Sequence, residues 1–130
     1  MHKANMVFGG GRSLGVKTLE WLCNYPEINI KAVMAVPREF DEQYYDSMQE
    51  IIKKYKLKVY SLDEICKMSF DFGLSVNYHK VLPEKILLRC KKGFFNVHHS
   101  YNLRLRGRYI TTHAILNCRK DNIFYHGTTL

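Results

Sequence analysis

The sequence of 130 residues lacks the features that mark membrane and secreted proteins. No apolar run approaches the roughly 20 residues that a membrane helix needs, so we expect no transmembrane segment. Its first residues lead directly into an apolar run at residues 6–8, without the hydrophobic stretch and cleavage pattern of a signal peptide. We therefore expect a cytoplasmic protein.

The sequence also lacks paired cysteines. No C-x-x-C pattern occurs, and tight spacing of that kind is usual in zinc sites and disulfide frameworks. We expect small thiols that are buried or half-buried. His98 and His99 are adjacent, so they face opposite ways on a strand, and no carboxylate or cysteine is close to them in sequence. We therefore expect no metal site. The four cysteines are Cys23, Cys66, Cys90 and Cys118.

Acidic residues are scarce: 12 Asp and Glu stand against 20 Lys and Arg, a net charge of +8. Such an excess favours anionic partners, which include phosphorylated substrates, anionic cofactors and nucleic acid. The basic residues are spread along the chain, and no nucleic-acid-binding motif is present. Their densest run, residues 53–58, is interpreted as the solvated end of a helix and the strand after it. We therefore expect an anionic small molecule rather than nucleic acid.

What is present is typical of one soluble globular domain, with 46% hydrophobic and 25% charged residues. Strand-like and helix-like segments alternate, which predicts a parallel sheet with helices on both faces. The fold class expected is α/β: a Rossmann-like three-layer domain over residues 1–130, with a mostly parallel sheet that misses its final strands. The expected strands are residues 6–8, 28–36, 59–60, 72–76, 93–98 and 124–130. The expected helices are residues 13–24, 41–55, 61–65, 83–88 and 109–117, with Ser13 as a cap of the first.

Polar clusters follow three of these strands, at the edge where α/β sheets bind ligands. The first is the turn Gly9-Gly10-Gly11, whose backbone amides precede a helix and are suited to an anionic substrate group. Counted from Gly9, the dinucleotide motif G-x-G-x-x-G requires glycine at position 14, which is Leu14, so a dinucleotide is disfavoured. The alternative is a turn that only reverses the chain.

The second cluster, residues 77–83, precedes a helix that starts near a proline. Its backbone groups are suited to a flat heterocycle, and a plain connector is the equal alternative. The candidate cofactor-binding residues are Tyr78, Lys80, Val81, Leu82 and Pro83.

The third cluster, Asn96-Val97-His98-His99-Ser100, ends the fifth expected strand. Strand alternation places Asn96 and His98 on the same side. An amide donor beside an imidazole is suited to stabilising an oxyanion, and the imidazole can move a proton near neutral pH. Asn96 and His98 are therefore the candidate catalytic residues.

The N-x-H strand, followed by a loop that ends in Arg106-Gly107, resembles the formyltransferases that use 10-formyltetrahydrofolate. Gly127-Thr128-Thr129-Leu130 resembles the opening of that family's next strand, and Val81-Leu82-Pro83 resembles its pterin segment. The resemblance implies that 10-formyltetrahydrofolate is the formyl donor. It implies that Asn96 holds the formyl oxygen and that His98 stabilises the oxyanion or delivers a proton. Binding of the substrate is assigned to Gly9, Gly10, Gly11, Ser100, Arg106 and Gly107.

The acceptor implied is a small-molecule amine, phosphorylated or linked to a nucleotide. The sequence from Arg108 to His113 is most similar to that of the branch that formylates amino sugars on nucleotides. The alternatives are a non-catalytic module that binds folate or nucleotide, and a fragment of a methionyl-tRNA or glycinamide ribonucleotide formyltransferase.

Two departures from the family pattern matter. Leu103 replaces a proline of the loop, and the family places an essential Asp after the G-x-T strand, beyond Leu130. We therefore expect an incomplete catalytic domain, with an unpaired sheet edge and little or no formyl transfer by these 130 residues alone. Whether the protein forms a homo-oligomer stays an open question.

Overall fold

The structure, a computed structural model, describes residues 2–34, 36–37, 47–98, 110–121 and 127–130. The chain divides into two compact units, Met1–Phe95 and Asn96–Leu130, and each is described by itself. That residues 1–130 form a single domain stays a prediction.

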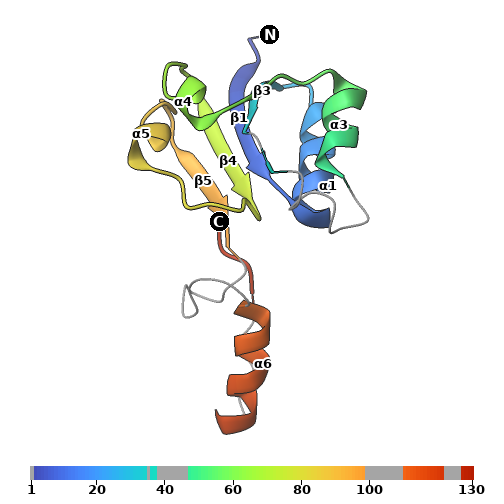
Figure 1. Ribbon diagram of the computed structural model, residues 1–130, viewed down its shortest axis with the longest axis vertical. Helices are drawn as coiled ribbons and strands as arrows, with labels where there is room; N and C mark the ends of the chain where they lie inside the picture. The colour runs from blue at the N-terminus through green and yellow to red at the C-terminus, as the bar shows by residue number, and fades with distance from the viewer. Residues whose placement is uncertain (1, 35, 38–46, 99–109, 122–126) are drawn as a thin grey trace. The chain divides into compact units, whose positions relative to one another are not determined.

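A five-stranded parallel sheet organises the fold (Figure 1). The strand order is β3-β2-β1-β4-β5, so the chain builds outward from β1 first to one side and then to the other. This order is that of the doubly wound Rossmann fold. The predicted α/β class with a parallel sheet is therefore confirmed. The strands are β1 (Ala4–Gly10), β2 (Ile28–Met34), β3 (Val59–Tyr60), β4 (Phe72–Val76) and β5 (Phe94–Val97).

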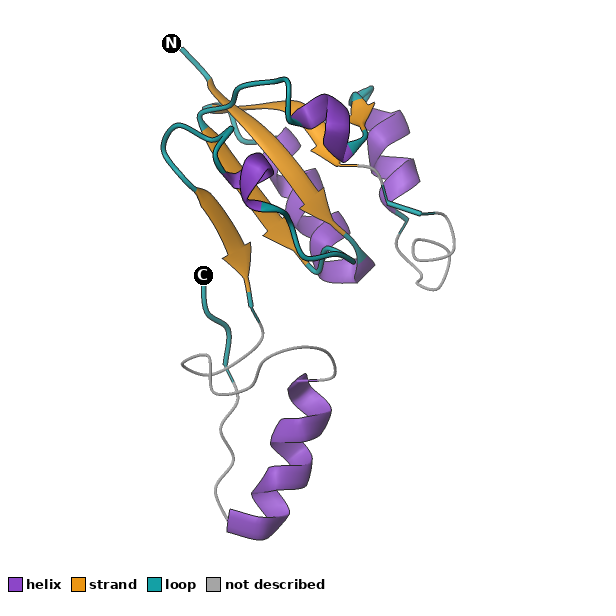
Figure 2. Cartoon of the chain, turned by 60° about the vertical axis from the view of Figure 1, so that its left-hand side comes forward, coloured by secondary structure: helices purple, strands orange, loops and turns teal. Residues whose placement is uncertain are grey.

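Helices cover both faces of the sheet in the first unit, which gives the three predicted layers (Figure 2). One face carries α1 (Arg12–Cys23) and α3 (Met48–Tyr55). The other carries the short helices α4 (Leu62–Ile65) and α5 (Glu84–Leu87). Among the described residues, no helix has both the length and the apolar character needed to cross a membrane.

The core follows the alternation of side chains along the central strands. Val7, Ala32 and Met34 share one face and pack with Ile65 of α4 and Ile86 of α5. All five are fully buried, and each of the four larger side chains contributes roughly 1.5–3 kcal/mol through burial. The intervening strand residues point to the opposite face, which α1 covers.

The start of α1 differs from the prediction. Ser13 does not cap this helix: α1 begins at Arg12, and its N-cap is Gly11, which makes no side-chain hydrogen bond. Gly11 is extended, and its amide donates to the carbonyl oxygen of Val76 at 3.1 Å. This bond ties the turn to the end of β4, so the helix starts before Ser13 is reached.

The start of α3 also differs. The helix begins at Met48, not at residue 41, because Ser47 has extended backbone and its hydroxyl accepts from the Gln49 amide at 3.2 Å. The other residues predicted to begin this helix lie outside the described residues. Ser47, a residue type favoured at N-caps, was the local signal for this boundary.

The caps of the two short helices agree with the sequence. Ser61 and Glu64 form the predicted capping box: the Glu64 amide donates to Ser61 Oγ, and the Ser61 amide donates to Glu64 Oε2 at 2.8 Å. The hydrogen bond from the Ser61 backbone lowers the pKa of Glu64. Pro83 is the N-cap of α5, so the helix begins at Glu84, one position after the predicted start.

The second unit contains α6 (Ile110–Asp121) and a short bridge. His98 and Thr129 exchange two backbone hydrogen bonds, each of 2.7 Å, in an antiparallel pairing. Part of the sixth strand expected at residues 124–130 lies outside the described residues, and its described part makes this single bridge.

The buried thiol of Cys90 makes stability depend on pH. Burial raises the pKa of this thiol from 9.0 to about 11. An unfolded chain therefore releases the proton first, so stability is complete below pH 9 and falls as the pH rises toward 11. Urea denaturation at pH 8 and pH 10.5 should show a larger loss for the parent than for Cys90→Ala. Equal losses in the two proteins would contradict this.

Candidate functional site

The strand order creates a switch point between β1 and β4. From β1 the chain moves to β2 and β3 on one side, and from β4 it moves to β5 on the other. Ligands of open α/β sheets bind outside the carboxyl ends of the strands at such a point. Gly10, the last residue of β1, pairs with Val76, the last residue of β4. The glycine turn and the loop after β4 therefore begin at the switch point, where a ligand site is expected.

The glycine turn packs too closely for side chains. A Cβ atom on Gly10 would lie 2.7 Å from the Phe8 ring, and one on Gly15 would lie 2.8 Å from the Val76 carbonyl oxygen. These glycines let the start of α1 rest on the ends of the two strands. The Gly11 amide already donates to Val76, so it is used within the fold. An anion-binding role for Gly9, Gly10 and Gly11 stays a prediction.

Sequence analysis missed the part that Gly15 plays. Counted from Gly10 instead of Gly9, the pattern G-x-G-x-x-G has its last glycine at Gly15, where close packing of helix and strand requires it. Arg12 then takes the central glycine position, with a left-handed φ of 57°. Asn77, directly after β4, is also left-handed, with a φ of 54°. Two such residues at one edge cost of order 1–3 kcal/mol each and are typical of ligand sites.

The five cofactor-binding candidates in the loop after β4 differ in their contacts and in their exposure to solvent. The Tyr78 ring lies 4.5 Å from that of His79, and burial raises the pKa of its phenol. Leu82 packs against the core cluster, as Tyr78 does. Val81 is 97% exposed. Lys80 is exposed and Pro83 caps α5. The cofactor-binding roles of these residues stay predictions.

A cleft of about 400 Å³ opens at this edge, beside Tyr78 and Lys80. This volume is in the range of small-ligand sites. Its lining is mixed, with two aromatic rings, apolar groups, a carboxylate and an amine. Sequence analysis assigned no binding role to the lining residues that follow β2 or that stand at the start of α4, although each of them lies after the end of a strand. The lining residues are Val36, Pro37, Ser61, Leu62, Asp63, Tyr78, His79 and Lys80.

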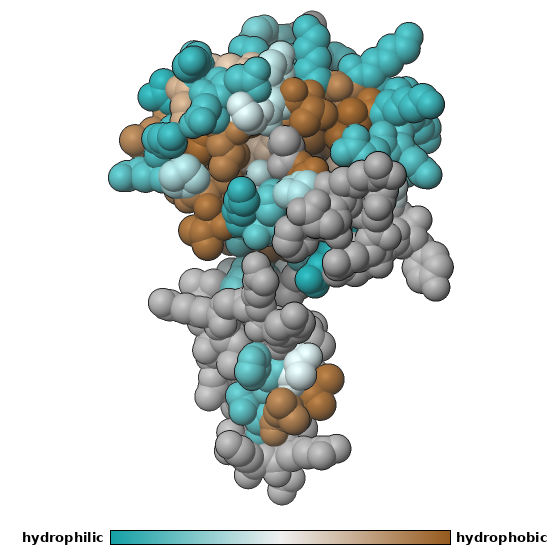
Figure 3. Space-filling view, viewed as in Figure 1, coloured by the Kyte–Doolittle hydropathy of each residue, from teal (hydrophilic) through white to brown (hydrophobic). Residues whose placement is uncertain are grey.

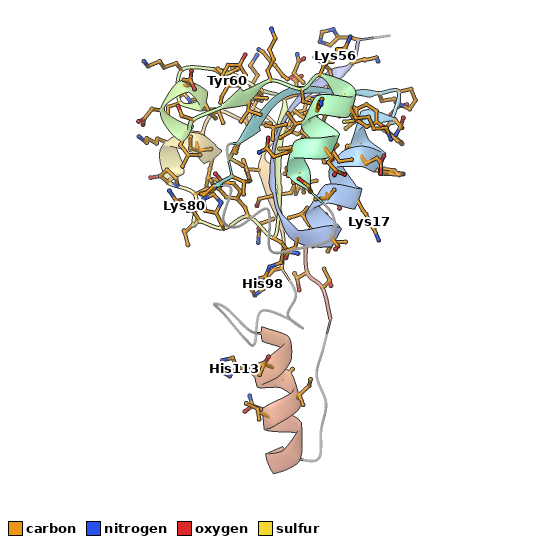
Figure 4. All side chains as sticks on the ribbon, turned by 45° about the vertical axis from the view of Figure 1, so that its right-hand side comes forward. Lys17, Lys56, Tyr60, Lys80, His98 and His113 are labelled. Carbon is orange, nitrogen blue, oxygen red and sulfur yellow. The ribbon has the colours of Figure 1, made fainter. Side chains whose placement is uncertain are left out.

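The two candidate catalytic residues belong to the second unit. Asn96 lies in β5 and is exposed, and His98 follows the strand, half-buried (Figure 4). The paired backbone bonds to Thr129 hold the His98 backbone in extended form. Ser100, Arg106 and Gly107 lie outside the described residues. The catalytic and substrate-binding roles of these residues stay predictions.

The described residues contain no group of three or more His, Cys, Asp or Glu side chains that could hold a metal ion.

The fold defines a class of protein. Glycinamide ribonucleotide transformylase 1 from Symbiobacterium toebii superposes with a TM-score of 0.71 at 11% identity, over 98% of this chain and 65% of its own. At that identity the likeness shows the fold alone. The first unit thus has the Rossmann-like arrangement found in a formyltransferase.

Sequence similarity points to the same family. The chain is 36% identical over 77 residues to the methionyl-tRNA formyltransferase of Mycoplasmopsis pulmonis, which covers 54% of this chain and 27% of that protein. It is 26% identical over 127 residues to that of Mycoplasma capricolum, covering 89% and 40%. The chain thus spans less than half the length of these relatives. No protein-family model matches it. The similarities support the formyltransferase resemblance without singling out the sugar-modifying branch.

Proposed function

We propose that this chain serves formyl transfer from 10-formyltetrahydrofolate to an amine. The observation that carries the proposal is the 36% identity over 77 residues with a methionyl-tRNA formyltransferase, in a chain with the fold of a glycinamide ribonucleotide transformylase. The cleft beside Tyr78 supports it further, because its aromatic and apolar lining suits the flat pterin of the donor. The exposed Lys80 suits the donor's carboxylates.

The reaction proposed for Asn96 and His98 accounts for every bond and proton with the amine, the donor and these two side chains. The neutral amine attacks the formyl carbon, and a tetrahedral oxyanion forms. Asn96 donates a hydrogen bond to the formyl oxygen, and His98 stabilises the oxyanion. Collapse breaks the bond to the folate nitrogen, and a proton passes from the attacking amine to that nitrogen, with His98 as carrier. The products are the formylated amine and tetrahydrofolate.

For the acceptor, we propose the amino group of a methionine carried on transfer RNA. Both relatives found by sequence are named for that substrate. An amino sugar on a nucleotide is the second candidate, favoured by the residues from Arg108 to His113. Offering each acceptor to the protein with the same donor would separate the two. Transfer to the sugar and none to methionyl-tRNA would overturn the first choice.

Binding of the donor is the first experimental test. Titration with 5-formyltetrahydrofolate, a stable analogue, should raise the melting temperature by several degrees, because ligand at a hundred times its Kd stabilises by roughly 2.7 kcal/mol. Tyr78→Ala should lose most of this shift. Tyr25→Ala is the control, because Tyr25 is exposed just after α1, and it should retain the shift. No shift in the parent protein would exclude the donor.

The alternative from a different class, a non-catalytic module, predicts the same shift without chemistry. Mixing the protein in excess with 10-formyltetrahydrofolate and an acceptor, and following the release of tetrahydrofolate, distinguishes the two. Binding without release supports the module and removes the transferase.

A further inference from the structure

The amino-terminal ends of the strands form the edge of the sheet opposite the glycine turn and the cleft. This edge carries eight exposed cations, which we call the basic edge. Figure 3 shows hydrophilic side chains along this margin of the first unit, and Figure 4 places Lys56 there, at the opposite end from Lys17 and Lys80. The basic edge consists of Lys3, Lys31, Lys56, Lys58, Lys67, Arg89, Lys91 and Lys92.

The parallel sheet gathers these side chains from distant parts of the sequence. Lys3 precedes β1, Lys67 lies before β4, and Lys91 and Lys92 precede β5. Because these parallel strands begin at one edge, the residues that precede them come together there. Lys58 extends the surface along the outer side of the sheet, since it precedes the short β3, whose first residue pairs with Val33 of β2. Lys31 joins them from within β2, since its ammonium donates to the Ser69 carbonyl oxygen at 3.2 Å.

The charge of the basic edge is not balanced by nearby acids. The acids near it are Glu27, Asp71 and Glu64. Asp71 already accepts from the Asn5 amide at 2.8 Å, and Glu64, which feels the charge of Lys67, is held mainly by the Ser61 capping box. Within the described part of the chain, the ion pairs are Lys54–Glu20 and Lys85–Asp63, and neither includes the basic edge. Eight exposed cations therefore share one surface, which creates a strong positive potential.

Aromatic rings flank this surface. Trp21, in the last turn of α1, is 60% exposed, and its ring lies 4.9 Å from that of Tyr25. Asn24 donates to the hydroxyl of Tyr55 at 2.8 Å, which holds this end of α1 beside the end of α3 and thus near Lys56. Exposed rings beside lysines suit nucleic acid, because bases stack on aromatic faces while phosphates meet the cations.

We propose that the basic edge binds single-stranded nucleic acid, with its cations on the phosphates and Trp21 against a base. The surface is separate from the cleft beside Tyr78 and Lys80, which lies at the other edge of the same sheet. The proposal therefore does not depend on formyl transfer. It differs from the expectation drawn from the sequence, which disfavoured nucleic acid because the basic residues are spread along the chain.

Two triple variants with equal net charge test the proposal. Lys3→Glu, Lys58→Glu and Lys91→Glu together alter the basic edge, and Lys17→Glu, Lys80→Glu and Lys85→Glu together alter the opposite edge. Fluorescence anisotropy with a labelled 20-nucleotide poly(U) strand, from 50 to 200 mM salt, gives the affinity and its salt dependence. Circular dichroism and melting curves check that all variants are folded.

The basic-edge triple should weaken poly(U) binding at least roughly tenfold and reduce the salt slope by about 2, because each lysine on a phosphate of a single strand contributes about 0.7. The opposite triple should change the slope by less than about 1. Trp21→Ala should weaken binding roughly tenfold without changing the slope, since a ring displaces no counterions.

Three results would overturn the proposal. The first is a parent protein that does not bind poly(U) at 50 mM salt. The second is an equal effect of both triples, which would show that binding follows net charge alone. The third is tighter binding of the parent to vesicles containing phosphatidylserine than to poly(U), with the basic-edge triple abolishing it, which would identify a membrane surface instead.

Discussion

Asn96→Ala is expected to slow formyl transfer roughly a hundred- to a thousand-fold relative to the parent chain, however slow the parent is, because this is the usual cost of removing one donor to an oxyanion. The amide is proposed to meet the formyl oxygen as charge develops on it, so the loss should fall on the chemical step and not on donor affinity. Single-turnover release of tetrahydrofolate measures that step, and the shift in melting temperature with 5-formyltetrahydrofolate measures binding.

The matched control for this experiment is Asn29→Ala. Asn29 lies on β2 toward the amino-terminal edge, is exposed, and donates to the Asn5 side chain at 2.8 Å. The same substitution there should leave the transfer rate within about twofold, since a surface change of this kind usually alters stability by no more than about 0.5 kcal/mol. If Asn96→Ala keeps the rate of the parent, Asn96 has no part in the reaction.

Phe8→Ala is expected to destabilise the fold by about 3–5 kcal/mol. Phe8 is fully buried in the central strand, and its ring lies against Gly10 in the glycine turn. The substitution removes apolar contacts and leaves a cavity beneath the turn. Since small domains are stable by only about 5–15 kcal/mol, the urea midpoint should fall markedly, without a matching change in the m-value.

Phe95→Ala is the control for this prediction. Phe95 is 42% exposed on β5, and its ring centroid lies 6.3 Å from that of Phe72. Losing it should cost about 1 kcal/mol, in the range of a single aromatic contact with partial burial. A comparable loss in both variants would contradict the central position of Phe8 in the core.

Local signals in the sequence predicted most of the secondary structure. Continuous apolar runs marked β2 and β4, and the Ser61–Glu64 box and Pro83 marked the short helices, because caps and buried strands act through near neighbours. The errors fell at helix starts. Gly11 replaced Ser13 as the cap of α1 because a backbone bond to Val76, 65 positions later, sets the turn. No local pattern reports such a contact.

By itself, the sequence determined the α/β class, the alternation of elements and the family resemblance carried by Asn96 and His98, since periodicity and motif spacing are local properties. The tertiary structure decided which distant residues meet. The strand order brought the glycine turn and the loop after β4 to one edge, with a cleft completed by Val36 and Asp63. It also gathered dispersed lysines at the opposite edge. The physical reason is that hydrogen bonding between parallel strands aligns all their beginnings on one side and all their ends on the other.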